Sequence, residues 1–206
     1  MSNLKTRTDK GKYTFHFMKG VLMQNKSTGA LGPSSRELAN VVTDLAELSG
    51  KKVIVEYGPG TGVFTEAIME RMDKGALFLS MEVNDEFVEI TRKRCPGVRV
   101  IHDSAQNTYK YLDELGHTHC DVIVSGLPWT RFPEDLQDEI LESTYKVLKP
   151  GGHFVTFAYA TSPYVPSGKK FFKGKLEERF DRVWQTKRIW KNFPPCVVFV
   201  GEKAAQ

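Results

Sequence analysis

The feature that most constrains the fold is a glycine-rich turn between an apolar run and a helix-like segment. Residues 53–55 are apolar and β-branched, Glu56 and Tyr57 follow, and glycines stand at positions 58, 60 and 62. Apolar residues then recur with helical spacing over residues 63–69. This pattern predicts a strand, a tight loop and a helix, as in open α/β sheets. Glycines at the turn allow the backbone to pass close to a bound ligand.

A carboxylate at the end of this predicted strand limits the ligand that the loop can hold. Glu56 would repel a phosphate, and the lysine and spacing of a P-loop are absent. A cationic or zwitterionic ligand attached to an adenosine fits better. A second acid, Glu82, ends the apolar run 76–82. It stands about 20 residues after the loop, where dinucleotide-type folds place a ribose-binding carboxylate.

Further apolar runs predict the rest of a sheet. Three more strands are expected over residues 98–102, 121–125 and 152–158, the last of them after a turn at 148–152. Helices are expected near residues 34–48 (capped by Ser34 or Ser35), 63–73, 85–94, 105–115 and 134–148. Two final strands, at about 182–190 and 196–202, predict a closing hairpin. The sequence therefore predicts an α/β fold with a mainly parallel seven-stranded sheet, helices on both faces and a C-terminal antiparallel hairpin.

Taken together, these motifs resemble the Rossmann-like class I S-adenosylmethionine (SAM) methyltransferases. The resemblance rests on Glu-x-Gly-x-Gly-Thr-Gly, Glu82, Asp103-x-Ala105 and Leu-Lys-Pro-Gly-Gly, in that order along the chain. It implies that the loop glycines pass beneath the methionine part of SAM, with Glu56 near its amino end. Glu82 would bind the ribose hydroxyls, and Asp103 and Ala105 would meet the adenine. The implied SAM-binding set is Glu56, Gly58, Pro59, Gly60, Thr61, Gly62, Glu82, Val83, Asp103, Ser104 and Ala105.

A narrower resemblance covers nearly the whole chain. The segments at residues 28–36, 56–65, 125–128 and 192–195 are similar to those of bacterial phospholipid N-methyltransferases of the phosphatidylethanolamine N-methyltransferase type. The chain departs from that family after Pro128, where Trp-Thr-Arg-Phe-Pro replaces small apolar residues. The resemblance implies methylation of the amine of phosphatidylethanolamine or a related aminolipid, with S-adenosylhomocysteine as the other product. It also implies a cytoplasmic protein that is peripheral on the inner face of the cytoplasmic membrane.

The segment after the fourth predicted strand is the expected catalytic element. An amine must be neutral to attack a methyl group, yet an alkylammonium has a pKa of about 10. In related amine methyltransferases this position supplies carbonyls and a side-chain oxygen that hold the amine, which points to Ser125, Gly126, Leu127 and Pro128. The alternative is that Gly126 and Pro128 only form a turn.

Aromatic residues near this segment are candidates for substrate binding. Tyr13, Trp129 and Tyr159 are expected to hold a methylated ammonium through cation–π contacts, or else to serve as core or lid. Lys169 and Lys170, on an expected basic helix, are predicted to bind lipid phosphates, with Phe171 and Phe172 inserting into the membrane interface. The alternative is a solvated basic face.

Charge is segregated along the chain. Residues 1–36 and residues 166–191 each carry a net charge of +6, which leaves −8 for the remainder. Basic segments of this kind favour an anionic partner, either lipid headgroups or nucleic acid. The chain of 206 residues divides into a basic amphipathic segment over residues 1–33, for membrane contact and cofactor cover, and a methyltransferase domain over residues 34–206. No apolar run approaches the ~20 residues of a membrane span.

Two other functions remain open on the sequence alone. Ser-Gly-Leu-Pro-Trp129 resembles the Asn-Leu-Pro-Tyr of rRNA adenine dimethyltransferases, in which an aromatic ring stacks on a flipped base. The second alternative is a non-catalytic protein that binds SAM and membranes. The lipid function is favoured over a nucleic-acid partner. The cysteines lack metal-ligand spacing, so no metal is expected. The sequence does not address the oligomeric state.

Overall fold

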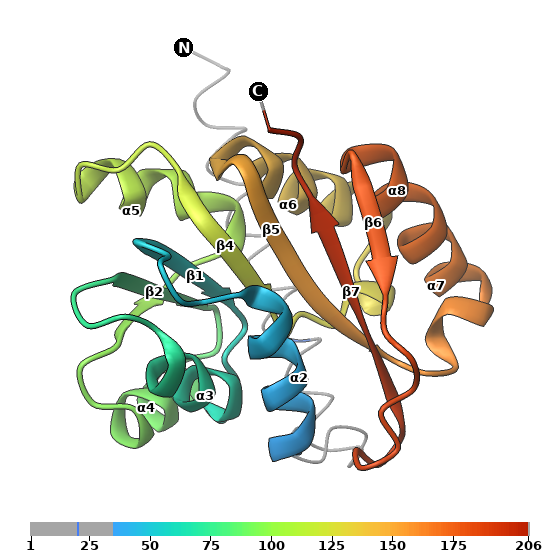
Figure 1. Ribbon diagram of the computed structural model, residues 1–206, viewed down its shortest axis with the longest axis horizontal. Coiled ribbons are helices and arrows are strands. Elements are labelled where there is room, and N and C mark those ends of the chain that lie inside the picture. The colour runs from blue at the N-terminus through green and yellow to red at the C-terminus, as the bar shows by residue number, and fades with distance from the viewer. Residues whose placement is uncertain (1–19, 21–34, 206) are drawn as a thin grey trace.

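A seven-stranded sheet forms the centre of the protein, with strand order β3-β2-β1-β4-β5-β7-β6 (Figure 1). The computed structural model describes Gly20 and residues 35–205. The first five strands in this order are parallel, and β7 runs antiparallel to both β5 and β6. The predicted fold class is confirmed, including the antiparallel C-terminal hairpin.

The elements alternate between strand and helix through most of the chain. The strands are β1 (Val53–Tyr57), β2 (Leu77–Glu82), β3 (Arg99–His102), β4 (Cys120–Ser125), β5 (Leu148–Tyr159), β6 (Arg182–Gln185) and β7 (Cys196–Glu202). The α-helices are α2 (Arg36–Ala46), α3 (Val63–Arg71), α4 (Asp85–Arg94), α5 (Thr108–Glu114), α6 (Glu134–Val147), α7 (Pro166–Lys170) and α8 (Leu176–Arg179). Three 3₁₀ turns lie at Ala105–Asn107, Trp129–Arg131 and Ser162–Tyr164, and a π-helical segment, Phe171–Lys175, joins α7 to α8.

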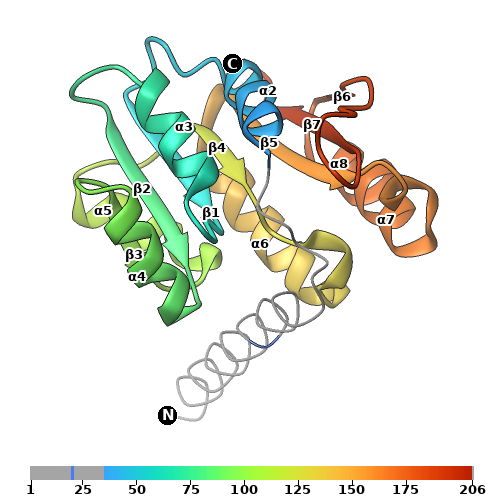
Figure 2. The same ribbon diagram turned by 90° about the horizontal axis from the view of Figure 1, so that it is seen from below.

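Two hydrophobic cores cover the two faces of the sheet. Every residue of β1 is buried, and successive side chains point to opposite faces. Val53, Val55 and Tyr57 join the core that includes side chains of α5, α6 and α8. Ile54 joins the core formed with α2 and α3. Figure 2 shows α3 and α6 on opposite sides of β1 and β4. The central strands are therefore fixed from both sides, which gives a rigid base to the loops at their carboxyl ends.

The helix before β1 begins at a side-chain cap. The Ser35 hydroxyl accepts a hydrogen bond from the backbone N–H of Leu38 at 3.1 Å, so Ser35 rather than Ser34 is the cap. The helix ends at Ala46, because Glu47 adopts a left-handed conformation with φ of 48°. It is thus shorter than the predicted range of 34–48.

Two predicted strand boundaries were wrong. The turn expected at residues 148–152 belongs to β5, because Gly151 and Gly152 exchange backbone hydrogen bonds with Lys203 beyond the end of β7. The strand expected to reach residue 190 ends at Gln185. There the hydroxyl of Thr186 accepts the hydrogen bond from Val198 N, in place of a backbone carbonyl. The chain from 186 to 195 is therefore irregular, apart from one bridge between Ile189 and Cys196.

The expected basic helix is divided into α7, the π-helical segment and α8. Its two phenylalanines do not face outward: Phe171 and Phe172 are both buried in the core. The prediction that they insert into a membrane interface was wrong, because their rings fill the space between the helix and β7. Phe172 stacks on Phe199 of β7 with ring centroids 4.5 Å apart. In the described part of the chain, none of the helices has the length and apolar character needed to cross a membrane.

Candidate active site

The carboxyl ends of the parallel strands bring most of the predicted site residues to one edge of the sheet, the lower edge in Figure 1. Glu56 lies near the end of β1, Glu82 ends β2, Asp103 follows β3 and Ser125 ends β4. Strand β1 pairs with β2 on one side and β4 on the other. Strands β2 and β3 are therefore added to one side of β1 and the later strands to the other, so the strand order reverses at β1. Ligands of open α/β sheets bind at such a switch point.

The glycine loop leaves β1 in a conformation that requires glycine. Gly58, Gly60 and Gly62 have φ values of 68°, 57° and 82°, in the left-handed region. The N–H of Gly58 donates to Met81 O at 2.9 Å, which ties the loop to the end of β2. A Cβ at Gly60 would meet nothing within 4 Å. The loop therefore leaves open space at its tip, where a ligand can approach the backbone.

Glu56 is a buried carboxylate beneath this loop. Its Oε2 accepts hydrogen bonds from the hydroxyls of Thr65 and Ser80, both at 2.8 Å. Its Oε1 is buried and has no hydrogen-bond partner among the described residues. Burial raises the pKa of Glu56 to about 7, and the nearby Glu82 contributes to the rise. An unpartnered buried oxygen with this pKa is suited to accept a hydrogen bond from a cationic ligand.

Glu82 connects β2 to the glycine loop. Its Oε1 accepts from the backbone N–H groups of Val83 and Asn84, both at 2.8 Å, and its Oε2 accepts from Gly60 N at 3.3 Å. The side chain is 2% exposed, and burial raises its pKa to about 7. A carboxylate has about four acceptor positions, so one remains for a ligand hydroxyl.

Asp103 is held by its neighbours at the end of β3. Its Oδ1 accepts from Ser104 N at 2.7 Å and from the Asn107 amide at 2.8 Å, and its Oδ2 accepts from the Tyr111 hydroxyl at 2.7 Å. Burial, followed by the contact with Asp103, raises the pKa of Tyr111 to about 12, so Tyr111 stays a donor. Ala105 is buried directly after this turn. The two residues predicted to meet the adenine, Asp103 and Ala105, thus lie in one ordered turn.

Gly126 brings the end of β4 against the glycine loop. Its N–H donates to Tyr57 O at 2.7 Å, and a Cβ at this position would lie 2.6 Å from Gly58 O. Only glycine fits at so close a backbone approach. The expected catalytic segment and the expected cofactor loop are therefore in direct contact.

The carbonyls of the segment 125–128 differ in their partners. Those of Ser125, Leu127 and Pro128 accept hydrogen bonds from Thr156 Oγ1, Trp129 N and Arg131 N, at 3.1, 2.9 and 2.9 Å. No described residue donates to the carbonyl of Gly126. The Ser125 hydroxyl accepts from Leu127 N at 3.3 Å. The Gly126 carbonyl is thus the acceptor with most capacity for an incoming amine.

A mainly apolar cavity of about 170 Å³ lies beside this segment. It is lined by Gly126, Leu127, Pro128, Trp129, Thr130, Arg131, Phe157, Ala158, Tyr159, Ser162 and Phe172. The predicted residues 126–129 and Tyr159 thus share one cavity. Arg131, Ser162 and Phe172 were not predicted as lining residues, because they come from turns and a helix that only the tertiary fold brings together.

Trp129 forms the wall of the cavity as part of an aromatic cluster. Its indole stacks on Phe171 with centroids 4.7 Å apart and an interplanar angle of 18°. Its Nε1–H donates to Thr156 Oγ1 at 3.2 Å. Because one face of the indole is covered and the residue is 1% exposed, that face is unavailable to a cation or a base. Tyr159 is half-buried at the end of β5, and Tyr13 lies outside the described residues.

The two candidate lysines stand apart from the cavity, on the exposed side of α7. Lys170 pairs with Glu134 of α6 at 2.6 Å, whereas Lys169 has no ion pair among the described residues. The neighbouring Lys175 pairs with Asp138 at 2.6 Å. Acidic residues of α6 therefore neutralise part of the expected basic face.

The chain is similar to known methyltransferases. The family profile described as "Methyltransferase domain" matches residues 54–152. An ornithine lipid N-methyltransferase of Singulisphaera acidiphila is 25% identical over 186 residues, which cover 79% of this chain and 97% of the relative. A ubiquinone/menaquinone biosynthesis C-methyltransferase of Hydrogenovibrio crunogenus is 25% identical over 131 residues, covering 61% of this chain and 51% of the relative.

Solved structures share the fold. An O-methyltransferase of Bacillus cereus in complex with S-adenosylhomocysteine superposes with a TM-score of 0.63 at 16% identity, covering 92% of this chain and 90% of that one. A SAM-dependent O-methyltransferase of Thermotoga maritima superposes with a TM-score of 0.64 at 12% identity. The match covers 90% of this chain and 72% of that one. The protein is a SAM-dependent methyltransferase with the Rossmann-like methyltransferase fold.

The residues of this methyltransferase fit SAM at the glycine loop. The open space at Gly60 leaves room for the ligand, and the orphan Oε1 of Glu56 is placed to accept from an ammonium. Glu82 retains acceptor capacity for ribose hydroxyls. Among the described residues no group of three His, Cys, Asp or Glu side chains has the arrangement of a metal site.

Proposed function

We propose that this methyltransferase transfers methyl groups from SAM to the amine of an aminolipid, phosphatidylethanolamine or a related lipid, at a membrane surface. The observation that carries the proposal is the apolar cavity next to Gly126. It adjoins the glycine loop, and its wall offers hydrocarbon and aromatic surface rather than a polar pocket. The relative from Singulisphaera acidiphila, whose name specifies an aminolipid substrate, supports the same assignment.

The chain's own groups have defined tasks in this reaction. SAM, when bound, supplies a methyl group that is activated by a sulfonium. The segment 125–128 would align the amine for in-line attack, with the Gly126 carbonyl accepting a hydrogen bond from the amine N–H. The apolar walls formed by Trp129 and Phe172 exclude water and lower the pKa of the amine by desolvation, so that more of it is neutral. Tyr159, which lines the same cavity, is proposed to contact the methylated product, while Trp129 forms part of the apolar wall.

An RNA substrate is less well supported. In an adenine methyltransferase the aromatic residue after Leu-Pro must offer a ring face to a flipped base. Here the equivalent Trp129 is buried and stacked on Phe171. This observation favours the lipid over the base.

The test is transfer of labelled methyl from SAM to lipids in anionic vesicles. Phosphatidylethanolamine and an ornithine lipid are assayed separately, with ribosomal RNA in parallel. Label in either lipid supports the proposal and identifies the headgroup, and the mass of the product gives the number of methyl groups. Label in RNA alone would assign the protein to base methylation. Label in none of them, with SAM bound, would point to another amine acceptor.

The basic segments are proposed to support access to the lipid. The N-terminal segment over residues 1–33, which carries Tyr13, lies outside the described residues except for Gly20. Removal of residues 1–25 is expected to lower turnover on vesicles, and equal turnover would refute a role of this segment in lipid access. Lys169 and Lys170 are proposed to contact lipid phosphates, at about 1 kcal/mol for each basic residue near an anionic surface. The protein would then act as a peripheral protein at the inner face of the cytoplasmic membrane.

A further inference from the structure

Exposed large hydrophobic side chains are concentrated in one place on the described part of the protein. Tyr164 is 67% exposed, Val165 45%, Trp190 70% and Phe193 94%. Tyr109, at 42%, is the only other large hydrophobic residue in this part of the chain with comparable exposure. We call Tyr164, Val165, Trp190 and Phe193 the aromatic patch. Scattered apolar residues are normal on a protein surface, but a contiguous group marks an interaction site.

Three residues of the aromatic patch, Tyr164, Val165 and Trp190, line an apolar hollow of about 390 Å³, and Phe193 directly precedes the lining residue Pro194. The hollow is lined by Ala160, Thr161, Tyr164, Val165, Arg188, Trp190, Pro194 and Pro195. Its lining residues 160 and 161 lie between Tyr159 and Ser162, which line the cavity beside Gly126. The patch and the acceptor cavity are therefore neighbours at the carboxyl end of β5.

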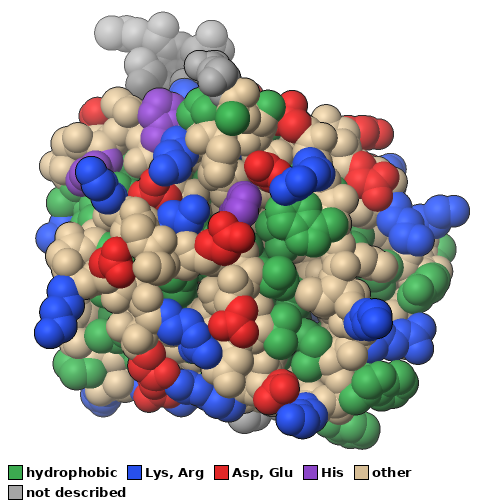
Figure 3. Space-filling view, viewed as in Figure 1, with side chains coloured by type: hydrophobic (Ala, Val, Ile, Leu, Met, Phe, Trp, Pro, Cys, Tyr) green, Lys and Arg blue, Asp and Glu red, His purple; other side chains and the backbone are tan. Residues whose placement is uncertain are grey.

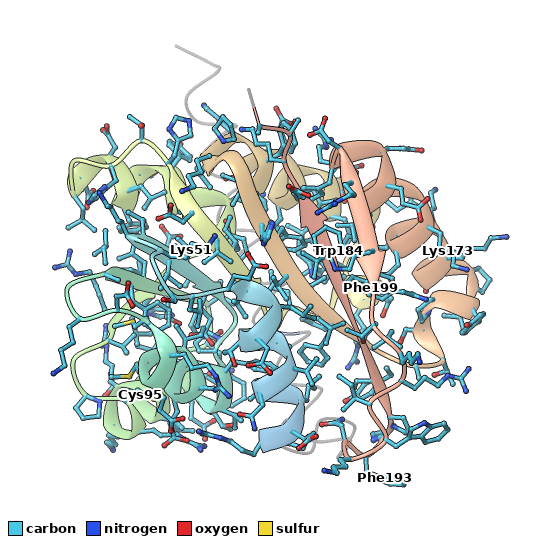
Figure 4. All side chains as sticks on the ribbon, viewed as in Figure 1. Lys51, Cys95, Lys173, Trp184, Phe193 and Phe199 are labelled. Carbon is cyan, nitrogen blue, oxygen red and sulfur yellow. The ribbon has the colours of Figure 1, made fainter. Side chains whose placement is uncertain are left out.

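The loop that carries Trp190 and Phe193 is held in place from beneath. The Asn192 side chain is buried; its Oδ1 accepts from Ser35 N at 2.9 Å and its Nδ2 donates to Pro194 O at 2.8 Å. Backbone hydrogen bonds between Ile189 and Cys196 close the loop. Figure 4 shows Phe193 at the lower margin of the molecule, just before β7 begins. The loop that presents Trp190 and Phe193 is thus anchored to the body of the protein.

The segments that form the patch carry only basic charges, and Glu37 of α2, 3.5 Å from Lys191, is an acid that pairs with them across the fold. No Asp or Glu occurs from residue 143 to 176 or from 186 to 201, the two segments that form the patch. Basic residues alternate with the aromatic ones, and Arg188 lies 6.0 Å from the Trp190 ring and Lys173 5.5 Å from the Tyr164 ring. Figure 3 shows basic and hydrophobic side chains together at the lower right of the molecule.

We propose that the aromatic patch docks the protein on an anionic phospholipid bilayer, with Trp190 and Phe193 inserted among the headgroups. Trp and Tyr are favoured at that depth, since one end of each ring is apolar and the other polar. Lysine and arginine side chains beside them would contact lipid phosphates. The hollow then faces the bilayer and leads toward the acceptor cavity, so a lipid amine has a short path to the site. This last step rests on the proposed function, whereas bilayer docking does not.

The experiment measures binding of the full chain to vesicles by co-sedimentation. The test variant is Trp190→Ser with Phe193→Ser, and the control is Tyr109→Ser. Tyr109 is a matched control because it is an exposed ring with two lysines nearby, Lys110 and Lys146, on a different part of the surface. Vesicles contain either phosphatidylglycerol with phosphatidylethanolamine or phosphatidylcholine alone. Circular dichroism checks that all variants fold.

We expect the double variant to bind anionic vesicles about tenfold more weakly and the control to change less than about twofold, since binding scales with the apolar area that is inserted. Wild-type binding should also weaken with salt and be poorer on phosphatidylcholine. Brominated lipids should quench tryptophan fluorescence in wild type, and this quenching should disappear in Trp190→Phe. Equal vesicle binding by wild type and double variant, or unchanged quenching in Trp190→Phe, would overturn the proposal.

Two further measurements separate the proposal from its alternatives. Loss of ribosomal RNA binding in the double variant, with vesicle binding unchanged, would assign the patch to nucleic acid and overturn bilayer docking. Methyl transfer to aminolipid in detergent micelles tests the function without a bilayer. Patch-dependent vesicle binding without lipid methylation refutes the proposed function alone, and lipid methylation with patch-independent binding refutes the docking alone.

Discussion

The carboxyl edge of the sheet has two sides that differ in chemistry, and the boundary runs between β1 and β4. On the side of β1 and β2, the ligand-facing groups are the buried carboxylates of Glu56 and Glu82, held by hydroxyl and backbone donors. On the side of β4 and β5, the facing groups are apolar and aromatic, with Trp129 as the largest buried side chain. A ligand with several polar groups suits the first side, and a hydrocarbon substrate suits the second.

The difference would let one sheet edge serve both ligands of the proposed reaction. Carboxylates fix a cofactor by directed hydrogen bonds, so their removal should affect affinity far more than folding. The packed aromatic side works by exclusion of water, so changes there should affect stability and acceptor use together. The predictions below test this comparison, beginning with the largest expected effect.

Removal of the Glu82 carboxylate should abolish useful SAM binding. Glu82→Ala eliminates the acceptor of Val83 N, Asn84 N and Gly60 N as well as the expected ribose contact. We expect an affinity loss of roughly 100-fold, the scale of two hydrogen bonds to a charged group. Isothermal titration with SAM measures it, and thermal unfolding confirms that the variant is folded. Retained affinity in a folded variant would refute the ribose role.

A methyl group at the boundary between the two sides should disturb both. In Gly126→Ala the new Cβ would lie 2.6 Å from Gly58 O, so β4 and the glycine loop must separate. We expect a loss of about 2 to 3 kcal/mol in unfolding free energy, together with weaker SAM binding. Gly174→Ala is the control, since its Cβ would meet nothing within 4 Å. Urea unfolding of both variants measures the difference in their unfolding free energies. Equal unfolding midpoints would contradict the close contact between Gly126 and Gly58.

SAM affinity should rise with pH through neutrality. Burial raises the pKa of Glu56 from 4.5 to about 7, so much of this carboxyl is protonated at pH 6 and accepts poorly from a cation. Ionisation through this one group should strengthen binding about eightfold from pH 6 to pH 7.5. Titration calorimetry at both values measures the rise, and Glu56→Gln should flatten it. A rise of the same size in Glu56→Gln would assign it to another group.

The free energy of unfolding of the ligand-free protein should fall, not rise, as the pH increases through neutrality. The folded pKa of Glu56 lies above its unfolded value, as does that of Glu82. Each group therefore stabilises the fold fully below about pH 4.5 and loses that contribution as the pH rises through about 7. Ligand affinity and ligand-free stability thus have opposite pH dependences on the carboxylate side.

The two sides also differ in how well the sequence predicts them. The glycine loop, Glu56 and Glu82 were placed correctly at the ends of β1 and β2, because each belongs to a local pattern of strand followed by turn. Their assigned contacts with SAM remain predictions. The fold as a whole follows from the same alternation, down to the closing hairpin.

The aromatic side depends on contacts between distant parts of the chain. The ring face of Trp129 is covered by Phe171, 42 residues later, and no local pattern shows this. Phe171 and Phe172 stand among lysines, which made them look exposed, yet tertiary packing buries them. Conversely, Trp190 and Phe193 are exposed because Asn192 anchors their loop to Ser35, far away in sequence. Burial of single aromatic residues is set by such pairings, and periodicity does not carry that information.

The smallest effect concerns the hydrogen-bond chain that supports the aromatic side. Thr156 Oγ1 accepts from Trp129 Nε1 at 3.2 Å and donates to Ser125 O at 3.1 Å. Thr156→Val keeps the shape but removes both hydrogen bonds, whereas Thr156→Ser keeps the hydroxyl. We expect Thr156→Val to lose about 1 kcal/mol of unfolding free energy more than the serine variant. Its KM for the lipid acceptor should rise while SAM affinity stays unchanged, because Trp129 and the segment 125–128 lose their shared support. If SAM affinity falls as much as acceptor use, the two sides of the sheet edge are coupled through β4, and the division between them would not hold.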